Sequence, residues 1–390
     1  MIKKTYYEKP FEYLKRKDGG AYSEETVKNW YKARAYVLDK LKDIAYSPDS
    51  KEHLHVVVCG DSDLMLAVVR QVALSAHYIN FREYNEFGEL IYPNRTIITL
   101  VSDKNDIETI LNKEEYLNNL LTICGYKIHE NEKKNTDSFM DIELEVVDDV
   151  AKINDNNAIK ITESEVQDFV NSKLQDEIYN IDTRKAILAG RVYGLGGIIG
   201  NLPAEDIHSA HRYTLALNVF KYKLMKEKLT SIVNEPSWNE NQFKVKNSLS
   251  DVFCADCFES RLLSIKRYCK SKKIQENEAW EANNEALSIS EHARWIAEKL
   301  IMGFRCLDDK EHLKDESLFG KNKKQYRDSL KKNRRKDKRD NNIDDFAHID
   351  LCSYHDLRRI NPDDMKYDSF LMLAIPEILE KINKDDKKWS

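Results

Sequence analysis

Three side chains with chemically useful groups follow one another at helical spacing in the stretch SEHARWIAEKLIMGFR, residues 290–305. His292, Trp295 and Lys299 stand at positions i, i+3 and i+7, so on an α-helix they lie along one face. Such a row can form a pocket wall, in which the indole stacks on a planar base, the imidazole bonds its polar edge and the ammonium meets a phosphate. The row also fits a tryptophan packed at a domain seam with the lysine over its ring, and spacing alone favours this structural role.

The residues around this row predict the helix that positions it. Ser288 and Glu291 form a capping-box pattern that predicts the helix start, and Gly303 predicts its end. Glu291, Arg294 and Glu298 are expected to point into solvent as ion pairs that contribute little to stability. A separate apolar stripe beside the row consists of Ile289, Ala293, Ile296 and Leu300.

Two stretches of the C-terminal third resemble the RyR domain, the repeat named after the ryanodine receptor and found alone or fused in bacterial proteins. They are EHARWIAEKLIMGF and, downstream, HIDLCSYHDLRRINPDDMKYDSFLMLAIPEIL. The chain departs from the family pattern at Phe304, which stands for a second tryptophan, at Ile349, which stands for a proline, and in a loop enlarged by a basic block. The positions that match the pattern are His292, Trp295, Lys299, Gly303, His348, Tyr354, Leu357 and Tyr367 or Asp368.

This resemblance implies a nucleotide site, because RyR repeats of the eukaryotic receptor are implicated in binding adenine nucleotides. A domain of the potassium-channel regulatory (TrkA-N) kind followed by an RyR domain also resembles a bacterial arrangement associated with nucleotide sensing in anti-phage defence. The expected function is therefore a cytoplasmic nucleotide-binding sensor or adaptor that works as a homo-oligomer. The candidate ligand-binding residues are His292, Trp295, Lys299, Phe304, Arg305, His348, Tyr354, Arg358 and Tyr367.

Two other function classes stay open beside the sensor. One is an enzyme that acts on a nucleotide or an NAD-like molecule, and the other is an oligomerisation or interaction module without a ligand. No Gly-x-Ser-x-Gly, Walker A or HExxH motif is present, and no nucleophile is paired with His292 or His348. The sequence therefore leans against an enzyme.

Upstream, three apolar, β-branched runs predict a parallel sheet. Leu54–Cys59, Arg95–Asp103 and Asp141–Asp149 have the pattern of strands, and helical patterns separate them. Strands that alternate with helices form parallel sheets, so residues 51–180 are predicted to be a Rossmann-like (TrkA-N-like) domain. The predicted fold class is α/β plus mainly α, a Rossmann-like parallel sheet domain followed by a helical RyR-type domain.

The turn after the first strand supplies the candidate cofactor-binding residues Gly60 and Ser62, with Asp103 as the candidate partner of a ribose. A dinucleotide fingerprint has three glycines at this turn, and the chain keeps only Gly60. Asp61 and Asp63 would repel a phosphate, and Asp103 lies 43 positions beyond Gly60, where the fingerprint has about 20. A structural domain, or one with a different ligand, is favoured over a dinucleotide site, and the cofactor stays unknown.

The remaining segments complete the predicted organisation. Residues 1–50 are expected to form an N-terminal helical segment and 181–250 a glycine-rich helical connector. Residues 251–390 are expected to be the RyR-like helical domain, with a basic insertion at 308–345. Eleven Lys or Arg residues lie between Lys321 and Arg339, which fits a solvated insertion better than a nucleic-acid site.

Two smaller patterns in these segments are weak signals. Gly194, Gly196 and Gly200 have a spacing similar to a phosphate-binding loop, but the residues before them have a helical pattern and favour close helix packing or a hinge. His208 and His211 lack a third metal ligand, so a helix surface is favoured for them.

Composition narrows the function classes. The 390-residue chain has a formal net charge of −5 and a mean hydropathy of −0.64, which gives no global attraction to nucleic acid or to an anionic membrane. No apolar run is long enough to span a bilayer, and the basic N-terminus lacks the apolar segment of a signal peptide. Seven thinly spread cysteines favour free thiols in the cytoplasm. No metal is expected at the lone CxxC of Cys254 and Cys257.

Overall fold

The fold is described from a computed structural model. Among the described residues, no helix is long and apolar enough to cross a membrane. The structure describes residues 9–84, 86–87, 90–103, 107–128, 132–134, 138–179, 181, 183–200, 245–306, 347–348, 350–360 and 365–389. The basic insertion, including residues 321–339, and the pair His208 and His211 lie outside the described residues.

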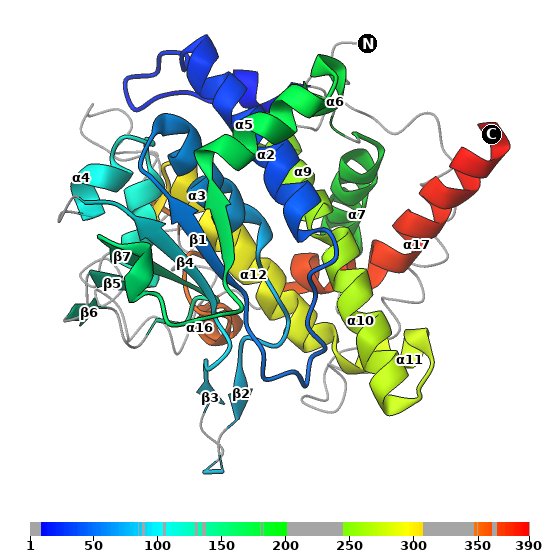
Figure 1. The fold of residues 1–390 in the computed structure, drawn as a ribbon. Coiled ribbons are helices and arrows are strands. Elements are labelled where there is room, and N and C mark those ends of the chain that lie inside the picture. The colour runs from blue at the N-terminus through cyan, green and yellow to red at the C-terminus, as the bar shows by residue number, and fades with distance from the viewer. Residues whose placement is uncertain are drawn as a thin grey trace, which may run out of the picture.

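A six-stranded sheet lies on one side of the molecule, to the left in Figure 1, and most of the C-terminal helices lie to its right. Its strand order is β6-β5-β7-β4-β1-β8, in which all neighbours are parallel except β6, which runs antiparallel to β5 at one edge. The strands are β1 (His55–Cys59), β4 (Thr96–Val101), β5 (Gly125–Ile128), β6 (Glu132–Lys134), β7 (Ile142–Val147) and β8 (Ile159–Thr162). A separate two-stranded pairing joins β2 (Glu83–Tyr84) and β3 (Leu90–Ile91).

The three strands predicted from the sequence coincide with β1, β4 and β7, so the prediction of a parallel α/β sheet is confirmed. The sequence did not predict β5 and β8. Each has only four residues, GYKI and IKIT, and neither segment carries a long apolar run. Both nevertheless pair with a predicted strand, β5 with β7 and β8 with β1.

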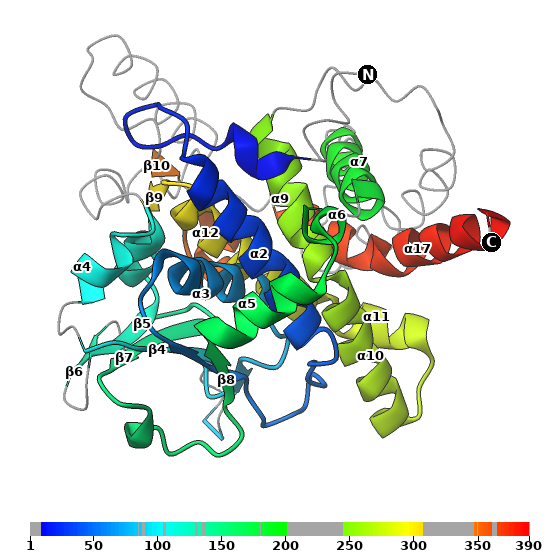
Figure 2. The ribbon, with the colours of Figure 1, turned by 45° about the horizontal axis from the view of Figure 1, so that its top comes forward.

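Alternate residues of the central strands bury one face of the sheet under helices, as the two-residue period of a strand requires. Val56, Val58, Ile98 and Leu100 are buried in the main core. Above this face lie α2 (Glu24–Leu41), α3 (Asp63–Ser75) and α5 (Glu163–Ser172), which Figure 2 shows on one side of the strands.

The first turns of these helices are fixed by hydroxyl caps. The hydroxyls of Ser23, Ser62 and Thr162 accept backbone N–H groups at the starts of α2, α3 and α5. At α5 the carboxylate of Glu165 also accepts the backbone N–H of Thr162, which completes a capping box. Ser62, in the turn after the first strand, is therefore the cap of α3.

The opposite face of the sheet carries polar side chains that bond across the strands. The imidazole of His55 lies 3.0 Å from Asp155 through Nδ1 and 2.8 Å from the Thr99 hydroxyl through Nε2. Thr99 in turn donates to Glu145 at 2.9 Å. These contacts tie the loop before β8 to β1, β4 and β7.

The described part of the chain after residue 181 is mainly helical, as predicted. Its helices are α7 (Thr183–Gly200), α9 (Val245–Asp256), α10 (Phe258–Lys272), α11 (Glu276–Ala282), α12 (Asn284–Ile301), α16 (Tyr354–Ile360) and α17 (Met365–Trp389). The glycines of the connector lie inside α7. The helix α12 packs on α3, α9, α17 and the 3₁₀ helix η2 (Leu117–Thr122).

The predicted start of α12 is wrong by one turn, whereas its predicted end is confirmed. The helix begins at Asn284, and the hydroxyl of Ser288 donates to the carbonyl of Asn284 inside the helix, so Ser288 is no cap. The added turn carries Leu287, which is fully buried, so packing extends the helix beyond the capping pattern. At the other end Gly303 has a φ of 88°, in the left-handed region that ends helices.

Candidate functional site

The helix α12 brings together the row that the sequence singled out. The rings of His292 and Trp295 are nearly parallel, with centroids 5.8 Å apart and an interplanar angle of 16°. The Lys299 ammonium lies 5.6 Å from the centroid of the Trp295 ring. His292 is buried, while Trp295 and Lys299 are half-buried.

Residues from a distant part of the chain complete an aromatic cluster around Trp295. The short strands β9 (Arg305–Cys306) and β10 (Ala347–His348) pair in parallel, which holds His348 next to the end of α12. The His348 ring stands edge-on to Trp295, at 5.1 Å and 78°, and lies 6.1 Å from Phe304. Tyr354, the first residue of α16, lies 5.6 Å from His292.

Six of the nine predicted ligand-binding residues thus form one cluster, and the side chains of the other three contact other groups. Arg305 follows Phe304 in β9, where its Nη1 donates to the Cys306 carbonyl at 3.0 Å. Arg358 pairs with Glu285 at 2.8 Å on the surface. Tyr367 stacks on Tyr193 of α7, with ring centroids 4.5 Å apart. The residues of the cluster are His292, Trp295, Lys299, Phe304, His348 and Tyr354.

Both ring nitrogens of His292 face groups of the chain itself. Nε2 lies 3.0 Å from the Cys352 carbonyl, which can only accept, so this nitrogen carries a hydrogen. Nδ1 lies 3.5 Å from the Asp368 carboxylate. Burial raises the pKa of Asp368, although His292 lowers it in part. His292 therefore joins α12 to the segment before α16 and to α17, and it positions the cluster.

His348 differs from His292 because its side chain is 30% exposed. The backbone N–H of Asp350 donates to its Nδ1 at 3.2 Å. Nδ1 is therefore an acceptor, and the hydrogen of the neutral ring is on Nε2. The protonation of this partly exposed histidine is thus set by the chain through Asp350.

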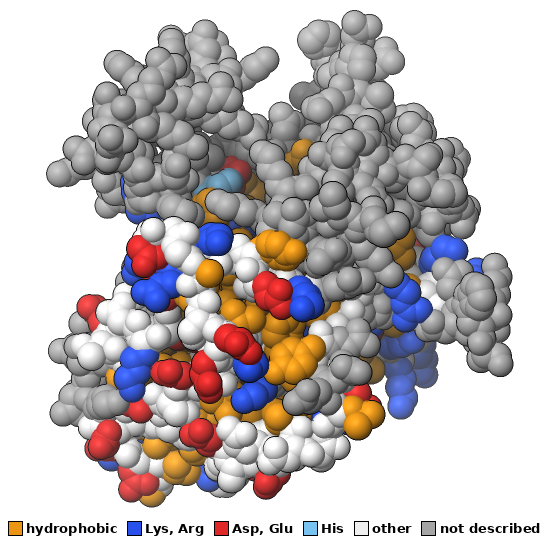
Figure 3. All heavy atoms as spheres, turned by 90° about the horizontal axis from the view of Figure 1, so that it is seen from above, with side chains coloured by type: hydrophobic (Ala, Val, Ile, Leu, Met, Phe, Trp, Pro, Cys, Tyr) orange, Lys and Arg blue, Asp and Glu red, His pale blue; other side chains and the backbone are white. Residues whose placement is uncertain are grey.

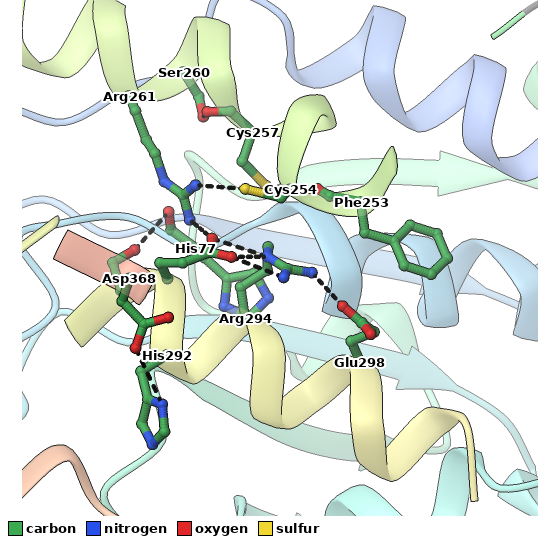
Figure 4. A network of polar contacts seen from close by, with 12 residues as sticks. His77, Phe253, Cys254, Cys257, Ser260, Arg261, His292, Arg294, Glu298 and Asp368 are labelled. Atoms are coloured by element: carbon green, nitrogen blue, oxygen red, sulfur yellow. Dashed lines mark hydrogen bonds and ion pairs between the residues drawn. The ribbon is translucent and has the colours of Figure 1, made fainter. Parts of the chain in front are cut away.

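The charged residues of α12 are buried, so the prediction that they are solvated ion pairs is wrong. Glu291, Arg294 and Glu298 are at most 2% exposed. Arg294 donates through Nε to Glu291 at 2.9 Å and through Nη1 to Glu298 at 2.8 Å, and Arg261 of α10 pairs with Glu291 at 2.7 Å (Figure 4). The reason is that α9, α10 and α17 cover the side of α12 that a lone amphipathic helix would expose.

The carboxylates of this network stay ionised in spite of their burial. Burial opposes the charged form of Glu291, but Arg294 and Arg261 lower its pKa to about 2. Burial likewise opposes ionisation of Glu298, whereas Lys299 and Arg294 lower its pKa. Lys299 lies 2.6 Å from Glu298 and 5.9 Å from the Phe304 ring centroid, so it links the buried network to the aromatic cluster.

The candidate cofactor residues lie at the carboxyl ends of two neighbouring strands. Gly60 follows β1 with a φ of 110°, and Asp103 is exposed shortly after β4. Ser62, the cap of α3, donates its hydroxyl to Glu163 at 2.8 Å. A carboxylate of the chain thus stands at the positive end of α3, where a phosphate would bind in a dinucleotide site.

The two cysteines of the CxxC pair lie near the same charged residues, Arg261, Arg294 and Glu291. Cys254 and Cys257 are free and buried, and Cys257 contacts the Ser75 carbonyl at 3.6 Å. Burial raises the pKa of Cys257 to about 12, so it is a thiol. Among the described residues no group of three or more His, Cys, Asp or Glu side chains has an arrangement that could hold a metal ion.

Sequence reasoning missed three contributors to the site. Asp368 was only an alternative to Tyr367, Cys352 contributes a backbone carbonyl that no side-chain pattern reveals, and Arg261 is separated from α12 by a whole helix. The comparisons with known proteins add nothing to this assignment: no family model, no curated protein and no solved structure matches the chain.

Proposed function

We propose that the chain is a cytoplasmic sensor or adaptor that binds a purine nucleotide or a nucleotide-derived messenger at the aromatic cluster. The observation that carries the proposal is the half-buried ring of Trp295, with Lys299 over it and the partly exposed His348 beside it. These groups come from two segments of the RyR-like pattern, and about 50 residues separate them along the chain.

Each group of the cluster has a chemical task in this proposal. The accessible part of Trp295 offers a surface on which a base stacks, a contact that contributes about 1–3 kcal/mol per base. The His348 ring, edge-on to Trp295 at 5.1 Å, borders one side of this stacking surface. Lys299 uses one of its three donors for Glu298, so it keeps donors for a phosphate. Lys299 is the cation of the buried network that reaches the aromatic cluster.

A binding experiment with two matched variants tests the proposal. Purified protein is screened by thermal shift against ATP, ADP-ribose, NAD, S-adenosylmethionine and cyclic oligonucleotides, and hits are measured by calorimetry. Trp295→Leu keeps an apolar side chain but removes the stacking surface, so affinity should fall by about tenfold or more. Trp295→Phe keeps an aromatic ring and should retain most of the affinity. Equal affinity in the wild type and Trp295→Leu would contradict the site.

The enzyme alternative is less well supported by this geometry. A general base needs a free nitrogen within reach of a substrate, and both nitrogens of His292 face groups of the chain. Turnover of a nucleotide that is lost in His348→Ala would restore the enzyme alternative.

The assembly alternative has its own observation, because Leu174, two residues after α5, is 72% exposed. Light scattering of Leu174→Ser beside the wild type tests whether this residue holds copies of the chain together.

Nucleic acid is less well supported as a partner than a nucleotide. On the face in Figure 3, acidic and basic side chains of described residues are interspersed with hydrophobic ones. The setting in anti-phage signalling rests on the family resemblance alone.

A further inference from the structure

A cavity of about 280 Å³ lies where the helices next to the sheet meet the C-terminal helices. This cavity is distinct from the aromatic cluster, because none of the six cluster residues lines it. The cavity is open to solvent on one side, and its volume is just below the range of roughly 300–1,000 Å³ of small-molecule sites. The residues used below are Arg34, Leu38 and Lys42 of α2, Lys185 of α7, and Ala255 and Asp256 of α9.

The floor of the cavity is apolar. Leu41, Val252 and Ala255 are buried hydrophobic residues that line it, and Leu38 and Ile181 add further apolar surface. An apolar floor favours a ligand with an apolar body, because the ligand removes that surface from water when it binds.

A buried ion pair stands at one side of this floor. Arg34 bonds Asp256 in a two-pronged arrangement, with Nε 2.9 Å from Oδ2 and Nη2 2.5 Å from Oδ1. The two side chains are 9% and 6% exposed. This arrangement uses two of the three guanidinium nitrogens, and within the described part of the chain Nη1 of Arg34 has no hydrogen-bond partner. Nη1 is thus a donor that the cavity can offer to an oxygen.

The other polar groups of the lining already have partners. The Ser75 hydroxyl donates to the Gln71 carbonyl at 2.9 Å, and the Ser260 hydroxyl donates to the Cys257 carbonyl at 3.0 Å. Lys185 pairs with Glu259. Lys42 pairs with Asp39 at 3.1 Å, and this pair is weak because the two side chains are 61% and 48% exposed. The charges of the lining are thus balanced by their partners, and Nη1 of Arg34 is the donor that remains for an oxygen of a ligand.

We propose that this cavity is a second ligand site, which takes a small carboxylic acid with an apolar body. The carboxylate meets Nη1 of Arg34, with Lys185 and Lys42 near the opening, and the apolar body lies on Leu38, Leu41 and Ala255. The site is independent of the nucleotide proposal, because it shares no residue with the aromatic cluster. A molecule bound here touches α2 and α3 on one side and α7, α9 and α10 on the other, so it stabilises their packing.

The test compares two probes of the same shape, 3-phenylpropanoate and 3-phenylpropanamide, by calorimetry and ligand-observed NMR on the full chain. The carboxylate should bind, and the affinity of the uncharged amide should be lower by about tenfold or more. Equal affinities would overturn the assigned ligand chemistry. No binding of either probe at millimolar concentration would overturn the site.

Substitutions locate the binding. Ala255→Leu fills the cavity without removing a polar contact, so affinity for the carboxylate should fall by about tenfold or more. Ala282→Leu makes the same change at an exposed position of α11 and should bind like the wild type. Leu38→Phe, at a half-buried position of the lining, fills the same space if Ala255→Leu does not fold. Unchanged affinity in the folded cavity-filling variant would overturn the site.

Discussion

Arg294 is fully buried between two glutamates of its own helix. The sequence predicts that the three side chains meet, but it does not predict that they are buried. The spacing of Glu291, Arg294 and Glu298 at three and four residues predicts that their side chains meet. The spacing contains no information on which elements cover them, because α9 and α10 precede α12 by many residues. Local charge pairing is therefore visible in a sequence, whereas burial of the pair is a tertiary property.

Burial decides how much this arginine contributes to stability. Arg294→Met keeps the length of the side chain but leaves Glu291 and Glu298 buried with one fewer cation. Loss of one partner from a buried pair costs about 3–5 kcal/mol, so the urea midpoint should fall strongly. The matched change Arg358→Met breaks an exposed pair with Glu285, whose side chains are 56% and 61% exposed, and should cost less than about 1 kcal/mol. Similar midpoints for the two variants would show that the network is solvated after all.

The elements differ in how well their ends could be predicted, and α12 illustrates both outcomes. Its end at Gly303 follows from local chemistry: Phe304 N–H bonds the Lys299 carbonyl at 2.8 Å and Gly303 N–H bonds the Leu300 carbonyl at 3.0 Å, the two bonds of a Schellman motif. Its start follows from packing of Leu287, which no capping pattern encodes. The cluster needs this end, because the turn at Gly303 places Phe304 beside His348.

Gly303 is constrained twice, and two alanine variants separate the constraints. A Cβ at Gly303 would lie 2.7 Å from the Tyr116 ring, in addition to the strain of a φ of 88°. Gly19 has a similar φ of 83°, but nothing lies within 4 Å of a Cβ there. Gly19→Ala should cost about 1–2 kcal/mol from backbone strain alone, and Gly303→Ala should cost about 1–3 kcal/mol more because of the clash. Thermal unfolding measures both variants, and equal costs would rule out the clash.

For the whole molecule, the sequence predicted the classes of structure but not how they join. Periodicity identified β1, β4 and β7 and the helical character of the C-terminal half, because each depends on nearby residues. The contact between Arg34 and Asp256 spans 222 positions, and Ser290 of α12 donates to the His77 carbonyl after α3 at 3.2 Å. Such contacts depend on the full three-dimensional arrangement. They also make the helices after residue 245 part of the packing around α2 and α3.

This shared packing predicts that the described regions unfold together. Buried residues from Phe11 to Ile382 form one hydrophobic cluster, so the α/β part loses its cover when the C-terminal helices detach. Two variants, each with a single tryptophan, report on the two parts: Trp30 lies in α2 and Trp280 in α11, and both are 3% exposed. Their fluorescence transitions in urea should coincide with each other and with the loss of helical circular dichroism, as in a single cooperative unit. If the Trp280 signal changed at a lower urea concentration than the Trp30 signal, the two regions would be separate domains that fold independently. A ligand in the cavity between them would then bind at an interface between domains and not within one shared core.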